Sequence, residues 1–193
     1  MAVKLEKGQR VSLEKPGGAA LSKIIMGLGW DPVKKKGFLG FGGGKVQIDL
    51  DASCLLLDDA KQLQDAVWFR QLQSKDGSIR HTGDNLTGEG EGDDEQIIVD
   101  LPRVPENISA LAFTVNSFSG QSFQQVENAY CRIVDAQTQE ELVRYDLSCQ
   151  GPHTALIMVK LYRKGGWKVH AIGETAQGRT FHDLLPKVVP HLG

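Results

Sequence analysis

The sequence predicts an all-β protein, an antiparallel β-sandwich with a minor helix near its C-terminal end. Two patterns carry this prediction. Short runs rich in Val, Ile and aromatic residues recur along the chain, each bounded by Gly, Pro, Asn or Asp, and no long amphipathic helix separates them. The length of 193 residues and the hydrophobic content of 40% suit a single domain over residues 1–193.

The first half of the chain offers four expected strands. Arg10–Leu13 alternates polar and apolar residues, and Ser22–Trp30 is a longer apolar run. Val46–Leu57 alternates with a period of two, as a half-buried strand does, and Asp65–Phe69 is short and ends in two aromatic residues. Trp30, Trp68 and Trp167 are expected in the core or at its edge.

The second half continues the pattern and ends in a short helix. One or two helical turns are expected within residues 180–189, cut at Pro186 because proline cannot donate a helical hydrogen bond. The expected strands are Gln96–Leu101, Ala110–Phe118, Ala129–Ala136, Glu140–Leu147, Thr154–Lys164 and Trp167–Gly173.

Composition and charge exclude several classes of function. A net charge of −2 gives no basic footprint for nucleic acid, and no apolar run is long enough for a transmembrane segment. The first residues lack the apolar core of a signal peptide. Three cysteines without a CxxC spacing, Cys54, Cys131 and Cys149, predict free, buried thiols in a reducing compartment. We therefore expect a cytoplasmic protein.

A Lys- and Gly-rich segment, Asp31 to Gln47, interrupts the strand pattern. Its glycines predict a flexible loop at about residues 32–45 between two strands. The alternative is a mobile contact arm, since Phe38, Leu39 and Phe41 beside lysines suit a membrane surface or a protein groove.

The segment from Asp84 to Glu95 concentrates negative charge. It holds six carboxylates in twelve residues, interleaved with glycines, and no Lys or Arg occurs between Arg80 and Arg103. Two interpretations follow from this pattern. Charge blocks are commonly solvated and disordered, so the segment is an acidic spacer, or it surrounds a cation.

Acids elsewhere in the chain favour the cation. Asp31 ends one expected strand, and Asp49 and Asp51 lie two apart on the next, so their side chains leave the same face. Loops of neighbouring strands gather at one end of a small sandwich, which would bring nine carboxylates together. Calcium takes about six to eight oxygen ligands, so this set suits calcium, with negative charge enough for two ions. The segment matches neither the EF-hand pattern nor a phosphate-binding loop.

Several motifs in this order resemble the TerD family of tellurium-resistance proteins. They are "GLGWD" (Gly27–Asp31), "DLDAS" (Asp49–Ser53), "GDNLTGEGEGDDE" (Gly83–Glu95), "VNSF" (Val115–Phe118) and "RYDLS" (Arg144–Ser148). The lead-in "VWFRQLQSKDGSIRHTGDN" and the segment "SCQGPHTALIMVKLYR" make the chain most similar to the TerZ branch, and the resemblance runs end to end. The Lys- and Gly-rich stretch is longer than in the TerD branch proper, which leaves its role open.

The resemblance implies a β-sandwich with calcium-binding loops gathered at one end and a part in bacterial tellurite resistance and stress response. It implies as partners other proteins of a tellurite-resistance operon, among them an integral membrane protein, and hence a cytoplasmic or peripheral inner-membrane location. Glu91 is a weaker ligand candidate, matching a position that is acidic in the family. The other candidates it implies are Asp31, Asp49, Asp51, Asp84, Asn85, Glu89, Asp93, Asp94 and Glu95.

An enzyme is the competing interpretation of the same acids. Paired carboxylates and two-metal sites hydrolyse phosphodiesters, so a divalent-metal-dependent hydrolase or an enzyme acting on tellurium oxyanions remains an alternative. Such sites usually add a proton-handling side chain, and His81 is the one near candidate. No residue is assigned as catalytic, and a calcium-ordered interaction module is the expected role.

Overall fold

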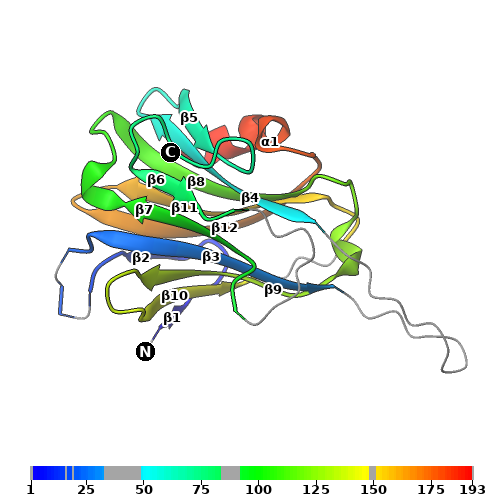
Figure 1. The fold of residues 1–193 in the computed structure, drawn as a ribbon, viewed down its shortest axis with the longest axis horizontal. Coiled ribbons are helices and arrows are strands. Elements are labelled where there is room, and N and C mark those ends of the chain that lie inside the picture. The colour runs from blue at the N-terminus through cyan, green and yellow to red at the C-terminus, as the bar shows by residue number, and fades with distance from the viewer. Residues whose placement is uncertain are drawn as a thin grey trace, which may run out of the picture.

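Twelve strands form two six-stranded sheets in the part of the chain that the structure, a computed structural model, describes: residues 2–15, 17–18, 20–32, 49–83, 92–147 and 151–192. The sheets pack face to face (Figure 1). In spatial order, sheet A is β1 (Val3–Lys4), β10 (Glu141–Asp146), β9 (Val126–Asp135), β3 (Lys23–Pro32), β7 (Glu95–Asp100) and β6 (Ile79–His81). Sheet B is β2 (Arg10–Ser12), β12 (Trp167–Ala176), β11 (Ala155–Arg163), β8 (Ile108–Ser117), β4 (Leu50–Asp58) and β5 (Leu63–Val67).

The core lies between the sheets because alternate residues of each strand point inward. In β3 the inward residues are Ile24, Met26, Leu28 and Trp30, and in β4 they are Leu50, Ala52, Cys54 and Leu56. All are buried. The pairings are antiparallel except that β1 joins β10 in parallel.

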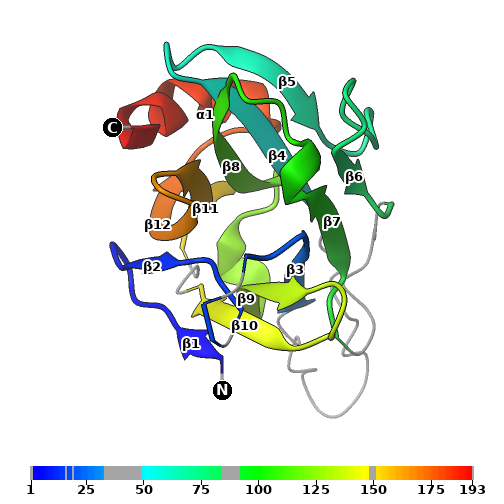
Figure 2. The ribbon, with the colours of Figure 1, turned by 90° about the vertical axis from the view of Figure 1, so that its left-hand side faces the viewer.

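A second apolar cluster covers the outer face of sheet B. Helix α1 (Phe181–Val188) lies against β8 and β11 (Figure 2) and buries Phe181, Leu184 and Val188 on them. The carboxylate of Asp183 accepts hydrogen bonds from the N–H groups of Arg179 and Thr180, at 2.8 and 3.2 Å, and so caps the helix start. The 3-10 helices are η2 (Leu101–Arg103), η3 (Phe123–Gln125) and η4 (Val189–Leu192).

The predicted sandwich is confirmed, with differences in detail. The expectation that Pro186 cuts the helix is wrong, because α1 runs through it to Val188. The helix tolerates this proline because Leu184 and Val188 on either side of it are held in the apolar cluster. The short strands β1 and β6 were not expected, since two or three residues carry no readable period. No described helix is long and apolar enough to span a membrane.

Two of the three cysteines and the first tryptophan are buried as the sequence predicts. Cys54 and Cys131 are free and buried as predicted, and Trp30 belongs to the core with 3% exposure. Cys149 and, apart from Pro32, the expected flexible loop at residues 32–45 lie outside the described residues.

We expect Leu184→Ala to lower the free energy of unfolding by about 2–5 kcal/mol, because it opens a cavity under a fully buried side chain. The matched control is Leu72→Ala, since Leu72 is 45% exposed and should change stability by no more than about 0.5 kcal/mol. Urea denaturation of the two variants checks this. Equal losses would show that α1 is not packed on sheet B as described.

Candidate functional site

Six of the predicted carboxylates lie within the described residues, at one end of the sandwich. We call this group the acidic end: Asp31, Asp49, Asp51, Asp93, Asp94 and Glu95. They sit at the end of β3, the start of β4 and the start of β7. The end of β3 and the start of β4 lie on the same side of the molecule (Figure 1).

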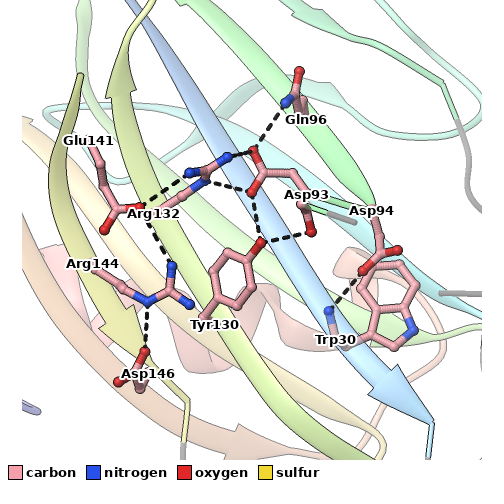
Figure 3. Close-up of polar contacts among 10 residues, drawn as sticks. Trp30, Asp93, Asp94, Gln96, Tyr130, Arg132, Glu141, Arg144 and Asp146 are labelled. Atoms are coloured by element: carbon pink, nitrogen blue, oxygen red, sulfur yellow. Dashed lines mark hydrogen bonds and ion pairs between the residues drawn. The ribbon is translucent and has the colours of Figure 1, made fainter. Parts of the chain in front are cut away.

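The carboxylate of Asp93 lies flat on the outer face of β3. Arg132 donates to it twice, from Nε to Oδ1 at 2.7 Å and from Nη2 to Oδ2 at 3.1 Å, and Gln96 Nε2 donates to Oδ2 at 3.0 Å (Figure 3). Gly27 of β3 is paired with Arg132 of β9 on one side and with Gln96 of β7 on the other. The Asp93 carboxylate, lying over Gly27, therefore bridges Arg132 and Gln96. A Cβ on Gly27 would lie 2.2 Å from Oδ2, so glycine is required there.

Tyr130 covers the next outward position of β3 in the same way. Its hydroxyl lies 2.8 Å from the Gly92 carbonyl oxygen and 3.1 Å from Asp93 Oδ1, so its single proton is shared between two acceptors. A Cβ on Gly29 would lie 2.5 Å from the tyrosine ring. Burial, and then the charge of Asp93, raises the pKa of Tyr130 to about 12, so the phenol remains a donor at neutral pH.

An ion-pair network extends from Arg132 toward the edge of sheet A. Arg132 Nη1 lies 3.2 Å from Glu141 Oε2, and Arg144 Nη1 lies 3.5 Å from the same oxygen. Arg144 Nε also contacts Asp146 Oδ1 at 3.0 Å (Figure 3), and its guanidinium lies 3.8 Å from the centroid of the Tyr130 ring. These contacts orient Arg132, because both sides of its guanidinium carry a carboxylate.

Asp94 and Asp31 gather at the end of β3. The Asp94 N–H donates to the Leu28 carbonyl at 2.8 Å, and Asp94 Oδ2 accepts from the Trp30 N–H at 2.9 Å. Burial raises the pKa of Asp94 and the Trp30 N–H lowers it, while the charges of Asp31 and Asp93 raise it further. Asp31 is exposed, and its Oδ2 accepts from Asn128 Nδ2 at 2.9 Å.

Glu95 points between the sheets and joins them. Its Oε2 accepts from the Ala52 N–H of β4 at 2.7 Å and lies 3.3 Å from His81 Nε2 of β6. The side chains of Glu95 and His81 are both fully buried. The second ring nitrogen of His81, Nδ1, accepts a hydrogen bond from the Gly83 N–H at 3.1 Å, so both nitrogens face protein groups within the described residues.

Asp51 lies on the opposite side of the sandwich from Asp31. In β4 the inward positions include Ala52 and Cys54, so Asp51 shares the outer face of sheet B with Leu55 and Leu57. In β3, Asp31 follows the inward Trp30 and lies on the outer side of sheet A. Asp51 is 5% exposed, and Asp49, just before β4, is half-buried.

The acidic end is therefore divided into three parts: Asp31, Asp93 and Asp94 on sheet A, Glu95 between the sheets, and Asp49 and Asp51 on sheet B. Within the described ranges, no three His, Cys, Asp or Glu side chains are arranged to hold a metal ion. Four predicted ligands, Asp84, Asn85, Glu89 and Glu91, lie outside the described residues. Whether the ten candidates form a metal site stays a prediction.

The residues that hydrogen-bond to the Asp93 carboxylate were not predicted from the sequence. Arg132, Tyr130 and Gln96 are scattered over two strands, and a single sequence does not show which strands pair. The alternating glycines of "GLGWD" were the available signal, because glycine at two successive outward positions indicates that other groups approach the strand closely.

Gly27→Ala should destabilise the protein by about 1–3 kcal/mol, because the new methyl group would collide with a carboxylate that Arg132 holds in place. The discriminating measurement is a double-mutant cycle with Asp93→Ala, by denaturant unfolding. In the Asp93→Ala background most of the cost of Gly27→Ala should vanish. An undiminished cost would mean that the collision is with something else.

Arg132→Met and Arg144→Met form a second matched pair. Arg132 pairs with the fully buried carboxylate of Asp93, whereas Arg144 pairs with exposed Asp146 and half-buried Glu141. We expect the first to cost about 1–3 kcal/mol of unfolding free energy and the second no more than about 1 kcal/mol. Thermal unfolding in low and high salt measures both. Equal losses would show that Asp93 does not depend on Arg132.

Comparison with known proteins agrees with the fold and with the motifs. The family model for the TerD domain matches residues 1–187. Tellurium resistance protein TerZ of Serratia marcescens is 54% identical over 97% of both chains. Stress response protein SCP2 of Bacillus subtilis (strain 168) is 44% identical over 98% of this chain and 100% of its own.

A solved structure shares the fold. A homologue of telluride resistance protein (TerD) from Streptomyces coelicolor A3(2) superposes with a TM-score of 0.66 at 19% identity, covering 82% of this chain and 92% of that one. None of the relatives described here is named as an enzyme. With the TerD model matched along nearly the whole chain, this protein belongs to the TerD family.

Proposed function

We propose that the protein binds calcium at the acidic end and that the ion-ordered surface serves as an interaction module in tellurium resistance or stress response. The observation that carries the proposal is the placement of Asp94 beside Asp31 at the end of β3, where the Leu28 carbonyl and the Trp30 N–H hold it; burial and the charges of Asp31 and Asp93 raise the pKa of Asp94 there. A bound cation would lower the electrostatic free energy of carboxylates that lie this close together. The names of the relatives supply the biological setting.

The donors fit calcium better than other metals. The acidic end offers carboxylate oxygens, while the nearby imidazole of His81 and thiol of Cys54 are buried in the sandwich interior. Hard cations prefer oxygen ligands, and calcium accepts the irregular geometry of loop donors. Bound calcium would supply positive charge to the carboxylates. Because the described acids form no complete shell, the site also needs donors from residues 84–91.

In this proposal the three acids Asp93, Asp94 and Glu95 have different roles. Asp93 is engaged by Arg132, Gln96 and Tyr130, and Glu95 by Ala52, so both anchor the segment to the sandwich. Asp94, held between these anchors, and Asp31 beside it are the ligands we favour on sheet A. Asp49 and Asp51 would serve a second ion on sheet B, which agrees with a total of two.

The proposed role is non-enzymatic and involves partners. His81, the nearest proton-handling side chain, is fully buried against Glu95, which argues against general acid–base catalysis there. We place the protein in the cytoplasm or at the inner face of the membrane, with other proteins of a tellurite-resistance operon. Phosphodiester hydrolysis by the Mg²⁺- or Mn²⁺-loaded protein, abolished by Asp49→Asn, would support the enzyme alternative instead.

Calcium titration tests the proposal directly. A ligand that binds the folded state alone raises the free energy of unfolding by about 2.7 kcal/mol at a hundredfold excess over its Kd. Calorimetry with calcium, and thermal melts in calcium and in EDTA, measure binding and stabilisation. If calcium changes neither the heat nor the melt, the proposal is wrong.

Asp94→Asn separates charge repulsion, measured in EDTA, from the loss of a ligand, measured in calcium. In EDTA the variant should be more stable than the parent by up to about 1 kcal/mol, because it removes repulsion with Asp31 and Asp93. In calcium it should gain less stability than the parent, because a ligand is lost. Asp59→Asn, an exposed acid outside the acidic end, is the control and should change neither.

The raised pKa of Asp94 also determines how the stability in EDTA depends on pH. Because the pKa of Asp94 is higher in the folded than in the unfolded chain, its contribution to stability falls as pH rises from the unfolded value near 3.9 to the raised one. Asp94→Asn should remove that fall. A variant that stays less stable than the parent in EDTA would contradict the repulsion.

A further inference from the structure

A row of basic side chains crosses the outer face of sheet B. Lys160 of β11 pairs directly with His170 of β12, and His170 pairs directly with Arg10 of β2. Directly paired residues point to the same face, and the inward neighbours Leu161, Val169 and Val11 place this row outside. The three strands lie side by side (Figure 2).

These basic groups have little to bind within the described chain. Arg10 is exposed and forms no hydrogen bond or ion pair with any described residue. His170 is 9% exposed, and its Nδ1 is buried without a hydrogen-bond partner in the described structure. Lys160, 4% exposed, donates one hydrogen bond, to the His191 carbonyl of η4, and its Nζ lies 5.0 Å from the centroid of the Tyr162 ring. A buried polar atom without a partner is costly and calls for an explanation.

The acidic residue of β12 is already engaged by another side chain. Glu174 of β12 is paired with His191, Oε2 to Nε2 at 2.8 Å. After burial, the charges of Arg10 and Lys61 lower the pKa of Lys160, and those of Arg10 and Lys160 help lower the pKa of His170 to about 4. The groups are thus close enough to repel one another, in a protein whose net charge is −2.

We propose that Arg10, Lys160 and His170 form a binding site for a phosphate-type oxyanion on the outer face of sheet B. Neighbouring strands are about 4.8 Å apart, so Arg10 and Lys160 flank the imidazole on either side, and the Lys160 ammonium has N–H groups left for an anion beside the one given to the His191 carbonyl. Arginine supplies a planar fork for two oxygens, lysine a point charge, and neutral histidine one N–H. The oxyanion is either a free ion or a lipid headgroup.

The site is distinct from the acidic end. Across sheet B, Lys160 is level with Ala112 of β8 and with Leu55 in the middle of β4. Asp49 and Asp51 lie instead just before β4 and at its start. Failure of calcium binding would therefore leave this proposal intact. Failure of oxyanion binding would likewise leave the calcium proposal intact.

The test is an NMR titration of the full chain with inorganic phosphate in EDTA at constant ionic strength. Saturable shifts are expected for the Arg10 side-chain N–H and the His170 ring, and the pKa of His170 should rise as the anion binds. Arg10→Gln should weaken binding by about tenfold or more, the loss typical of hydrogen bonds to a charged group. Arg80→Gln, an exposed arginine on sheet A, is the matched control and should leave the affinity unchanged.

Vesicles distinguish the two sources of the oxyanion. If free phosphate shifts neither side chain, the protein should sediment with phosphatidylcholine vesicles that contain phosphatidic acid, and Arg10→Gln should abolish this. Binding in neither arm overturns the proposal. So does an equal loss in Arg10→Gln and Arg80→Gln, because that would indicate attraction to overall charge rather than a site.

Discussion

The two-point contact between Arg132 and Asp93 is the interaction on which the acidic end depends. It fixes a buried carboxylate on β3, and this is sterically allowed because Gly27 presents no side chain. The adjacent residues are then placed by the chain itself: Asp94 reaches the Trp30 N–H, and Glu95 reaches β4. One ion pair thus positions three consecutive acids in three different environments.

This arrangement separates acids that look equivalent in the sequence. Arg132 donates to Asp93, the Ala52 N–H donates to Glu95 and the Trp30 N–H donates to Asp94. Of these three acids, Asp94 is the one whose pKa is raised, by burial and by the charges of Asp31 and Asp93. Hydrogen bonds from the sandwich thus offset part of the repulsion between these neighbouring carboxylates. The calcium proposed above would therefore have fewer carboxylates to neutralise than the total of nine suggests.

The sequence sufficed for the sandwich and for most of its strands because a period of two is legible in runs such as Val46–Leu57. It also located the acidic end, since Asp31, Asp49 and Asp51 are next to strand ends. It could not supply strand neighbours, so the meeting of Arg132 with Asp93 was hidden. Nor could it show that Asp31 and Asp51 leave opposite faces of the sandwich, because that depends on which side of each strand faces the core.

Both faces of strand β3 are covered by other parts of the chain. Ile24, Met26, Leu28 and Trp30 fill the core, while Gly27, Gly29 and Asp31 form the surface on which the acidic segment rests. A one-residue insertion or deletion in β3 would exchange these two faces at once, placing glycines in the core and a tryptophan under Asp93. Length in this strand should therefore vary less between relatives than side-chain identity, because substitutions affect one face whereas a shift of frame destroys both.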